Sequence, residues 1–299
     1  MRVLIVGCGY VGLPLGAELA RQGHQVFGIR RNPKALDELK AAHIQPISAD
    51  ITRAEHLERL PLPFDWVVNC VASGGGGAEE YRRLYLQGTQ NLIERFAAAP
   101  PQKFVYTSST SVYGQIDGSV VDETSPTTPA VPTAKVLLKT EEALLVAARQ
   151  KTFPAVILRL AGIYGPDRGY WFKQFLAGEA RMEGDGKRFL NMIHLDDVVG
   201  CVIATLQGGR AGEIYNAVDD EPVSQCDFFQ WLATTLASPM PPSVALEPDA
   251  ARKRGVTNKR VANGKLKAEL KYQFQYPDFR RGYAAEIRKS STSRSTKGL

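Results

Sequence analysis

The sequence contains few cysteines and no long apolar run. Its four cysteines are far apart and form no CxxC pair, and its four histidines form no cluster. Such spacing argues against a disulfide framework and against a bound metal, so we expect a reducing, cytoplasmic setting. The apolar run at residues 198–206 is far shorter than the roughly 20 residues that cross a bilayer, so no membrane association is expected. The cysteines are Cys8, Cys70, Cys201 and Cys226.

The positive charge of the chain is concentrated near its C-terminus. The net charge is +6, while hydrophobic residues (44%) and charged residues (23%) are near the averages for globular proteins, so a folded chain is expected. Residues 288–299 are basic and rich in Ser and Thr, and we expect them to form a disordered tail. Residues 252–271 are also basic but carry no interspersed aromatics. We therefore expect attraction for a phosphorylated small molecule and no nucleic-acid partner.

Short apolar runs alternate with helical patterns through the first two-thirds of the chain. This alternation is typical of βαβ units, whose parallel strands are buried on both faces and read as continuous apolar runs. We therefore predict an α/β fold with a Rossmann-type doubly wound parallel sheet. The predicted strands are residues 3–6, 25–29, 66–72, 104–108 and 155–160, and the predicted helices are residues 13–22, 79–99 and 133–150.

The pattern becomes less regular after residue 165. The chain has room for one large domain and a smaller one, because single hydrophobic cores stop growing at roughly 250 to 300 residues. We expect residues 1–165, with residues 188–220 returning to them, to form the Rossmann-type domain. Residues 166–187 and 221–287 are expected to form a small C-terminal substrate lobe.

A glycine-rich motif follows the first predicted strand and opens the first predicted helix. In this motif Gly7 permits a tight turn, Gly9 lets a pyrophosphate approach the backbone, and Gly12 allows close packing of helix and sheet. The helix N-terminus adds free N–H groups and a positive dipole end. The placement predicts a dinucleotide site that includes all three glycines together with Tyr10 and Val11.

Two arginines stand where a site for NAD would carry an acidic residue. Such an acid lies about 20 residues after the motif and hydrogen-bonds the ribose 2′-hydroxyl. Here the second predicted strand ends in Arg30 and Arg31. Guanidinium groups bind phosphate through charge-assisted, bidentate hydrogen bonds. The sequence therefore favours NADP(H) as the cofactor over the alternative that both arginines are solvated surface residues.

Several segments carry a family resemblance. They are the glycine motif and residues 48–51 (SADI), 107–114 (TSSTSVYG), 158–166 (LRLAGIYGP), 191–198 (NMIHLDDV) and 264–270 (GKLKAEL). On these segments, residues 1–283 resemble the extended and atypical short-chain dehydrogenase/reductases of the NAD-dependent epimerase/dehydratase family. The resemblance implies a nicotinamide cofactor and a small-molecule substrate, anionic or linked to a nucleotide. It assigns to the cofactor site Asp50, Ile51, Val71, Ala72 and Ser73.

The same resemblance implies a catalytic set of Asn, Ser or Thr, Tyr and Lys. The serine falls on Ser109, although this residue could instead only cap a strand end. No YxxxK motif follows: Thr133 stands at the tyrosine position and Leu137 at the lysine position. Tyr85 stands where the family has its Asn, and could act as a displaced acid/base or simply pack on the sheet. The candidate catalytic residues are therefore Ser109, Thr133 and Tyr85.

Two functions remain open from the sequence. One is an NADP-dependent oxidoreductase or sugar-nucleotide epimerase/dehydratase-like enzyme that works without the YxxxK dyad. The other is a non-catalytic NADP(H) sensor or partner-binding protein that keeps the fold without the chemistry. The candidates for holding an anionic substrate are Arg168, Lys187, Arg188 and Arg260.

Overall fold

The apolar runs near the N-terminus form the centre of one sheet. The computed structural model describes residues 1–32, 35–151, 153–245 and 257–295. Its main sheet has seven strands in the order β12-β7-β5-β4-β1-β2-β3, and the pairs β1–β2, β2–β3, β1–β4 and β4–β5 are parallel. The strands are β1 (Arg2–Val6), β2 (Gln25–Arg30), β3 (Gln45–Ser48), β4 (Trp66–Asn69), β5 (Lys103–Ser109), β7 (Ala155–Leu160) and β12 (Ile214–Ala217).

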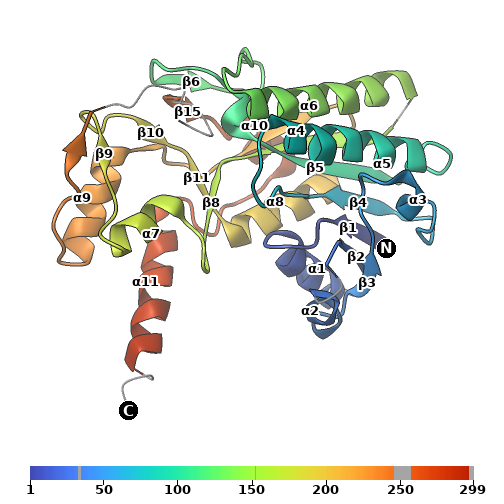
Figure 1. The fold of residues 1–299 in the computed structure, drawn as a ribbon, viewed down its shortest axis with the longest axis horizontal. Coiled ribbons are helices and arrows are strands. Elements are labelled where there is room, and N and C mark those ends of the chain that lie inside the picture. The colour runs from blue at the N-terminus through green and yellow to red at the C-terminus, as the bar shows by residue number, and fades with distance from the viewer. Residues whose placement is uncertain (33–34, 152, 246–256, 296–299) are drawn as a thin grey trace. The chain divides into compact units, whose positions relative to one another are not determined.

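Helices lie on both faces of this sheet, with α4, α5 and α6 together on one side and α1 and α2 on the other (Figure 1). The predicted Rossmann-type doubly wound fold is therefore confirmed. Within the described residues, no helix combines the length and apolar character needed to span a membrane. The helices are α1 (Gly12–Arg21), α2 (Leu36–Ala41), α3 (Ala54–Leu57), α4 (Ala78–Tyr81), the π-helix η2 (Arg82–Gln87), α5 (Gly88–Phe96), the 3₁₀-helix η3 (Thr110–Val112), α6 (Pro132–Lys151) and α8 (Leu195–Gly208).

The chain divides into two compact units. The first comprises Met1–Val112, Pro129–Arg159 and Val199–Tyr215, and the second Tyr113–Thr128, Leu160–Val198 and Asn216–Leu299. This division differs from the expected one in placing residues 113–128, 160–165, 188–198 and 216–220 in the second unit. The largest of these segments is 113–128. The reason for its placement is a long-range pairing, since β6 (Ser119–Val121) runs parallel to β15 (Lys259–Val261).

The described residues of the second unit form short strand pairs and helices. Besides β6–β15, β11 pairs with β8, β10 with β13, and β14 with β9. The strands are β8 (Gly162–Tyr164), β9 (Met182–Glu183), β10 (Phe189–Leu190), β11 (Met192–His194), β13 (Val223–Ser224) and β14 (Ser243–Val244). The helices are α7 (Tyr170–Leu176), α9 (Gln225–Thr235), α10 (Gly264–Leu270) and α11 (Phe279–Ser295).

Aromatic side chains fill the core of the second unit. Phe228 and Phe229 on α9 pack with Phe279 and Tyr283 on α11, and all four are at most 1% exposed. From this anchored first turn α11 continues to Ser295. Residues 288–295 are therefore helical, where the sequence predicted a disordered tail, because extending an existing helix costs far less than nucleating one. The remaining residues of the predicted tail, 296–299, lie outside the described part of the chain.

A buried ion pair joins α6 to two strands of the main sheet. The Glu141 carboxylate on α6 accepts hydrogen bonds from Arg159 on β7, the shortest 2.7 Å, and from the Ser108 hydroxyl on β5 at 2.5 Å. The side chains of Arg159 and Glu141 are only 4% and 1% exposed. A carboxylate buried this deeply is tolerated because its charge is balanced and its oxygens are hydrogen-bonded.

Removing one partner of this pair is expected to destabilise the protein strongly. Glu141→Ala should lower the free energy of unfolding by about 3–5 kcal/mol, because it leaves the Arg159 guanidinium buried without its counter-ion. Replacing both residues together, Glu141→Leu with Arg159→Met, should recover most of the loss. Urea denaturation followed by circular dichroism measures both. Glu18→Ala, which removes an exposed ion pair with Arg21, is the control and should cost at most about 1 kcal/mol. If Glu141→Ala lowers the free energy of unfolding by no more than this control does, the prediction is wrong.

Candidate functional site

The loop between β1 and α1 is held tightly against the end of β4. Gly7 has a φ of 83°, and a Cβ on it would lie 2.6 Å from the Val71 Cα. A Cβ on Gly12 would lie 2.8 Å from the Gly7 carbonyl oxygen. Neither position can hold a side chain without moving backbone. Packing within the protein therefore accounts for these two glycines of the motif.

Gly9 differs from both. The nearest atom to a Cβ built on it is the Gly7 carbonyl oxygen at 3.9 Å, and its φ is not in the left-handed region. The Gly9 N–H donates to that carbonyl at 2.7 Å, and its own carbonyl accepts the Leu13 N–H at 2.8 Å. Val11 caps α1 without a side-chain hydrogen bond. The loop thus presents open space over Gly9 beside a helix start that no side chain caps.

The segment after β4 lies next to this loop. The Val71 backbone contacts Gly7 as described, and Ala72 is exposed. The Ser73 N–H donates to the Tyr85 hydroxyl at 3.0 Å. The structure thus brings the predicted residues 71–73 to the same sheet edge as the glycine motif.

Arg30 and Arg31 have different surroundings. The Nε of Arg30 donates to the Cys8 carbonyl oxygen of the glycine loop, and its Nη2 lies 3.3 Å from a carboxylate oxygen of Glu38. Arg31 is exposed and lines a pocket at the end of β2. Arg30 is therefore already engaged within the protein, whereas Arg31 faces solvent.

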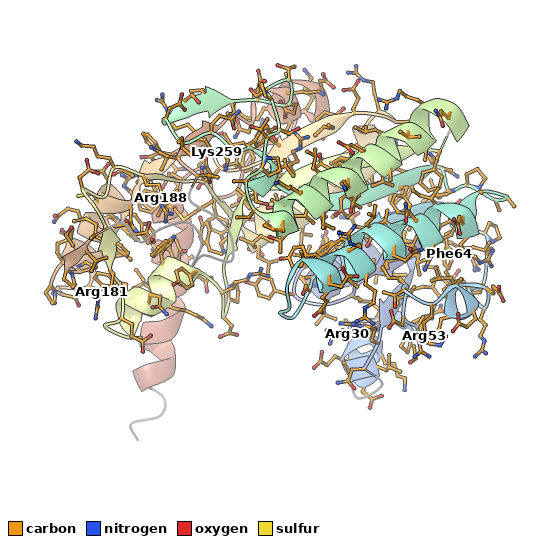
Figure 2. All side chains as sticks on the ribbon, turned by 45° about the horizontal axis from the view of Figure 1, so that its top comes forward. Arg30, Arg53, Phe64, Arg181, Arg188 and Lys259 are labelled. Atoms are coloured by element: carbon orange, nitrogen blue, oxygen red, sulfur yellow. The ribbon has the colours of Figure 1, made fainter. Side chains whose placement is uncertain are left out.

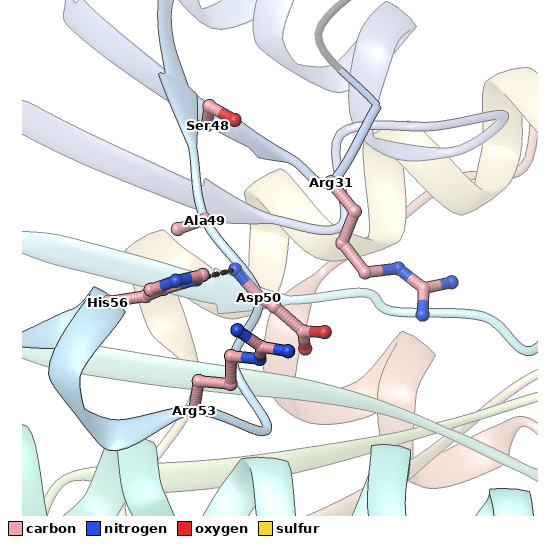
Figure 3. Close-up of a pocket in the computed structure, with 6 residues that line it drawn as sticks. All are labelled: Arg31, Ser48, Ala49, Asp50, Arg53 and His56. Atoms are coloured by element: carbon pink, nitrogen blue, oxygen red, sulfur yellow. Dashed lines mark hydrogen bonds between the residues drawn. The ribbon is translucent and has the colours of Figure 1, made fainter.

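The pocket beside Arg31 is bounded by the turn that follows β3. It is an open cavity of ≈ 230 Å³ (Figure 3). The Asp50 backbone N–H donates to Nδ1 of His56 at 3.1 Å, and the Asp50 carboxylate lies between the side chains of Arg31 and Arg53. The sequence prediction missed Arg53 and His56, since no local motif marks them. The lining residues are Arg31, Ser48, Ala49, Asp50, Arg53 and His56.

Asp50 is ionised more readily than an ordinary aspartate. Burial alone would raise its pKa, but hydrogen bonds from the Thr52 N–H (3.0 Å) and hydroxyl (2.9 Å) and the charges of Arg31 and Arg83 together lower that pKa. Ile51, its neighbour, is 3% exposed and packs against Gly88 of α5. The Asp50 side of the pocket therefore carries one negative charge and is packed against α5 through Ile51.

The three candidate catalytic residues occupy separate elements. Ser109 ends β5, is half-buried, and its hydroxyl accepts the Ser111 N–H at 3.2 Å, as a strand-capping serine does. Thr133 is in the first turn of α6. Tyr85 is 9% exposed on the π-helix η2, with its ring 4.8 Å from that of Tyr81. The Tyr85 hydroxyl accepts the N–H of Ser73, a residue of the expected cofactor site.

The second unit holds basic side chains of contrasting exposure. Lys187 is 84% exposed, whereas Arg188 is 18% exposed and lies 3.1 Å from Glu183. Lys259, which the sequence prediction did not single out, is only 4% exposed and donates to the Thr257 hydroxyl at 2.9 Å. Burial, reinforced by the charge of Arg188, lowers the pKa of Lys259 to about 8. Figure 2 labels Arg188 and Lys259.

The other two predicted anion-binding residues are exposed. Arg260 is exposed and its Nε donates to the Gly118 carbonyl oxygen at 3.0 Å. Arg168 is exposed in a turn after β8. Among the residues that the structure describes, no group of three or more His, Cys, Asp or Glu side chains could hold a metal ion.

Comparison with known proteins places the chain in one family. The model of the NAD dependent epimerase/dehydratase family matches residues 3–217. The protein YeeZ of Escherichia coli K12 is 31% identical over 288 residues, which cover 93% of this chain and 97% of YeeZ. A 3-diazoavenalumate denitrifying reductase of Streptomyces sp. is 27% identical over 96% of this chain and its own full length.

A solved structure shows the same fold over the whole chain. The dTDP-glucose 4,6-dehydratase DesIV of Streptomyces venezuelae, crystallised with NAD and TYD bound, superimposes with a TM-score of 0.84. The alignment covers 99% of this chain and 98% of that protein at 24% identity. At this identity the likeness concerns the fold.

The buried Lys259 ammonium should make stability depend on pH. Between the folded pKa of about 8 and the unfolded value of 10.5, Lys259 carries a proton in the unfolded chain that it has released in the folded chain, so this residue contributes a rise in the free energy of unfolding with pH across this window. Lys259→Met should abolish that rise and, below pH 8, stabilise the protein by up to about 3 kcal/mol.

Urea titrations at a series of pH values measure this effect. Lys187→Met, which removes an exposed ammonium from the same unit, is the control and should leave the pH dependence unchanged. If Lys259→Met destabilises the protein at pH 7, the ammonium makes contacts that outweigh its burial, and the prediction is wrong.

Proposed function

Because the chain belongs to the NAD-dependent epimerase/dehydratase family, we propose that it is an NADP(H)-dependent oxidoreductase that acts on a small, anionic or nucleotide-linked substrate. The β1–α1 loop would hold the pyrophosphate of this cofactor at Gly9, and Asp50 and Arg31 would hold its adenosine. When bound, the nicotinamide supplies or accepts a hydride. The remaining work, which is binding, orientation and proton transfer, falls to side chains of this chain.

The observation that carries this proposal is the open space over Gly9. Gly7 and Gly12 are explained by contacts within the protein, but nothing in the described structure comes closer than 3.9 Å to a Cβ on Gly9. A glycine that the fold does not need is explained by a ligand that approaches the backbone closely. The uncapped start of α1 beside it suits the charge of a pyrophosphate.

The arginines after β2 support NADP(H) over NAD(H). No acidic residue ends β2, where a hydrogen-bond acceptor for the ribose 2′-hydroxyl would stand. Arg31 instead offers a guanidinium to a 2′-phosphate at the pocket edge. The reductase and the dehydratase among the similar proteins support a redox role for the site.

All four cysteines are free thiols, which supports a reducing, cytoplasmic setting.

Tyr85 is the best-placed group to move a proton. Its hydroxyl contacts the Ser73 N–H in the segment beside the glycine loop, so its position is fixed at the cofactor edge of the sheet. Ser109 would orient the substrate oxygen by a hydrogen bond from its hydroxyl. Thr133 carries a hydroxyl too weakly acidic for general acid catalysis near neutral pH.

One observation favours the second candidate, a non-catalytic NADP(H)-binding protein. Leu137, at the position where the family resemblance expects a lysine, is 7% exposed and belongs to the core. No cation reaches the site from that position of α6. The catalytic proposal therefore depends on Tyr85 rather than on the family's usual dyad.

Gly9→Ala separates ligand binding from folding. The free energy of unfolding should change by no more than about 0.5 kcal/mol, because the added Cβ has room. NADPH affinity, measured by isothermal titration, should fall about tenfold or more, because the methyl group occupies the path of the pyrophosphate. Gly7→Ala is the contrasting variant and should destabilise the fold itself. Unchanged NADPH affinity in a folded Gly9→Ala protein would remove the main support for the proposal.

Turnover tests the assignment of Tyr85. NADPH oxidation is followed at 340 nm against a panel of carbonyl compounds and sugar nucleotides. Tyr85→Phe should lower kcat by about 10²- to 10⁴-fold, because the proton donor is lost, while NADPH affinity should fall no more than about tenfold, because the Ser73 N–H loses one neutral hydrogen-bond partner. Ser109→Ala should lower kcat and also raise KM, because the substrate oxygen loses the hydrogen bond from the serine hydroxyl. Tyr81→Phe, on the adjacent turn, is the control. Tight NADPH binding without turnover of any panel member would favour the non-catalytic candidate.

A further inference from the structure

We propose that Arg53 and Arg31 together hold the 2′-phosphate of NADP(H), and that Arg30 serves the glycine loop rather than the phosphate. Arg53 is thereby a specificity-determining residue for the cofactor. This inference rests on the proposed function and assigns the pocket of Figure 3 to one chemical group, a phosphate monoester on the adenosine ribose.

The register of the sheet brings Arg53 next to Arg31. β2 and β3 run parallel with Arg30 opposite Ser48, and the Ala49 N–H donates to the Arg30 carbonyl oxygen at 3.3 Å. The chain then turns at Asp50, where the Arg53 N–H donates to the Asp50 carbonyl oxygen at 3.1 Å. The two ends of the strand pair therefore present one arginine each to the same pocket.

Neither guanidinium of this pair is engaged elsewhere. Arg31 and Arg53 are both exposed, and neither side chain forms a hydrogen bond or an ion pair with any other residue that the structure describes. Arg30, by contrast, is bound to the Cys8 carbonyl oxygen and close to Glu38. Two free guanidiniums and one occupied guanidinium thus lie at the same edge of the sheet.

The charge of the pocket suits a dianion. Its only acid is Asp50, whose carboxylate already accepts hydrogen bonds from Thr52 and lies between the two free arginines. Two guanidiniums against one carboxylate leave the pocket positive. A phosphate monoester would offer oxygen acceptors to the guanidinium groups of both arginines, in the bidentate geometry that arginine favours.

His56 keeps the pocket wall in place. Its Nδ1 accepts the Asp50 N–H at 3.1 Å. The imidazole thereby orders the turn that connects β3 to α3. It acts as a positioning residue for Asp50 and Arg53.

Paired binding measurements test this division of roles. NADPH, NADH and adenosine 2′-monophosphate are titrated calorimetrically into the wild-type protein and into Arg31→Met, Arg53→Met and Arg30→Met. Loss of one charge-assisted contact should weaken NADPH about 10- to 100-fold in Arg31→Met and Arg53→Met, with NADH changed less than threefold. Arg30→Met should weaken both dinucleotides by a similar factor, because the loop they share loses its support.

Controls separate local from general effects. Arg59→Met removes an exposed arginine close in sequence that does not line the pocket, and should change neither affinity. Arg53→Lys keeps the positive charge but lacks the bidentate guanidinium group, and should bind NADPH more tightly than Arg53→Met but less tightly than the wild type. Thermal unfolding confirms that each variant folds, since both pocket arginines lie on the surface.

The outcomes distinguish this inference from the proposed function. If the wild-type protein prefers NADPH but Arg53→Met does not alter that preference, the role of Arg53 is overturned and the proposed function stands. If Arg30→Met weakens NADPH alone, the division between Arg30 and Arg31 is overturned. If the wild-type protein binds NADH as tightly as NADPH, or binds neither, both the NADP(H) proposal and this inference fail.

Discussion

The cofactor edge of this protein depends on one close approach, that of the β1–α1 loop to the end of β4. Gly7 reaches within van der Waals limits of the Val71 backbone only because it lacks a side chain and takes a left-handed conformation. This contact fixes where β1 ends, where α1 starts, and where residues 71–73 leave the sheet. The positions of Gly9 and, through Ser73, of the Tyr85 hydroxyl follow from it.

Sequence patterns predict the parts of the molecule that depend on neighbours along the chain. The strands, the glycine loop and the family are of this kind, because buried parallel strands and tight turns leave local signatures. Arg53 and Lys259 are not. Arg53 joins the pocket through the β2–β3 register, and Lys259 is buried through the pairing of β15 with β6. Neither long-range pairing has a local signature, so both residues read as ordinary surface charges.

The sequence predicts the position of Tyr85 but not its role. The sequence placed it where the family has an Asn and left open whether it is an acid/base or a packing residue. In the structure its ring packs on Tyr81 and its hydroxyl accepts the Ser73 N–H, and the acid/base role stays a prediction. In the π-helix η2 the backbone hydrogen bonds span five residues instead of the four of an α-helix, and this rotates the side chains. Such π-segments occur often at functional sites. A helical pattern in the sequence does not reveal that rotation.

The double attachment of Arg30, to the carbonyl of Cys8 and beside Glu38, has a consequence for how quickly a ligand can be captured. The end of β2 and the glycine loop are connected through Arg30 without a ligand, so the backbone loses little conformational freedom when a ligand binds. Preorganisation of this kind favours a docking step limited by diffusion rather than by rearrangement of the loop. If the exposed arginines of the pocket bind an anionic ligand as proposed, they would also attract it at long range during encounter, and added salt would screen this attraction.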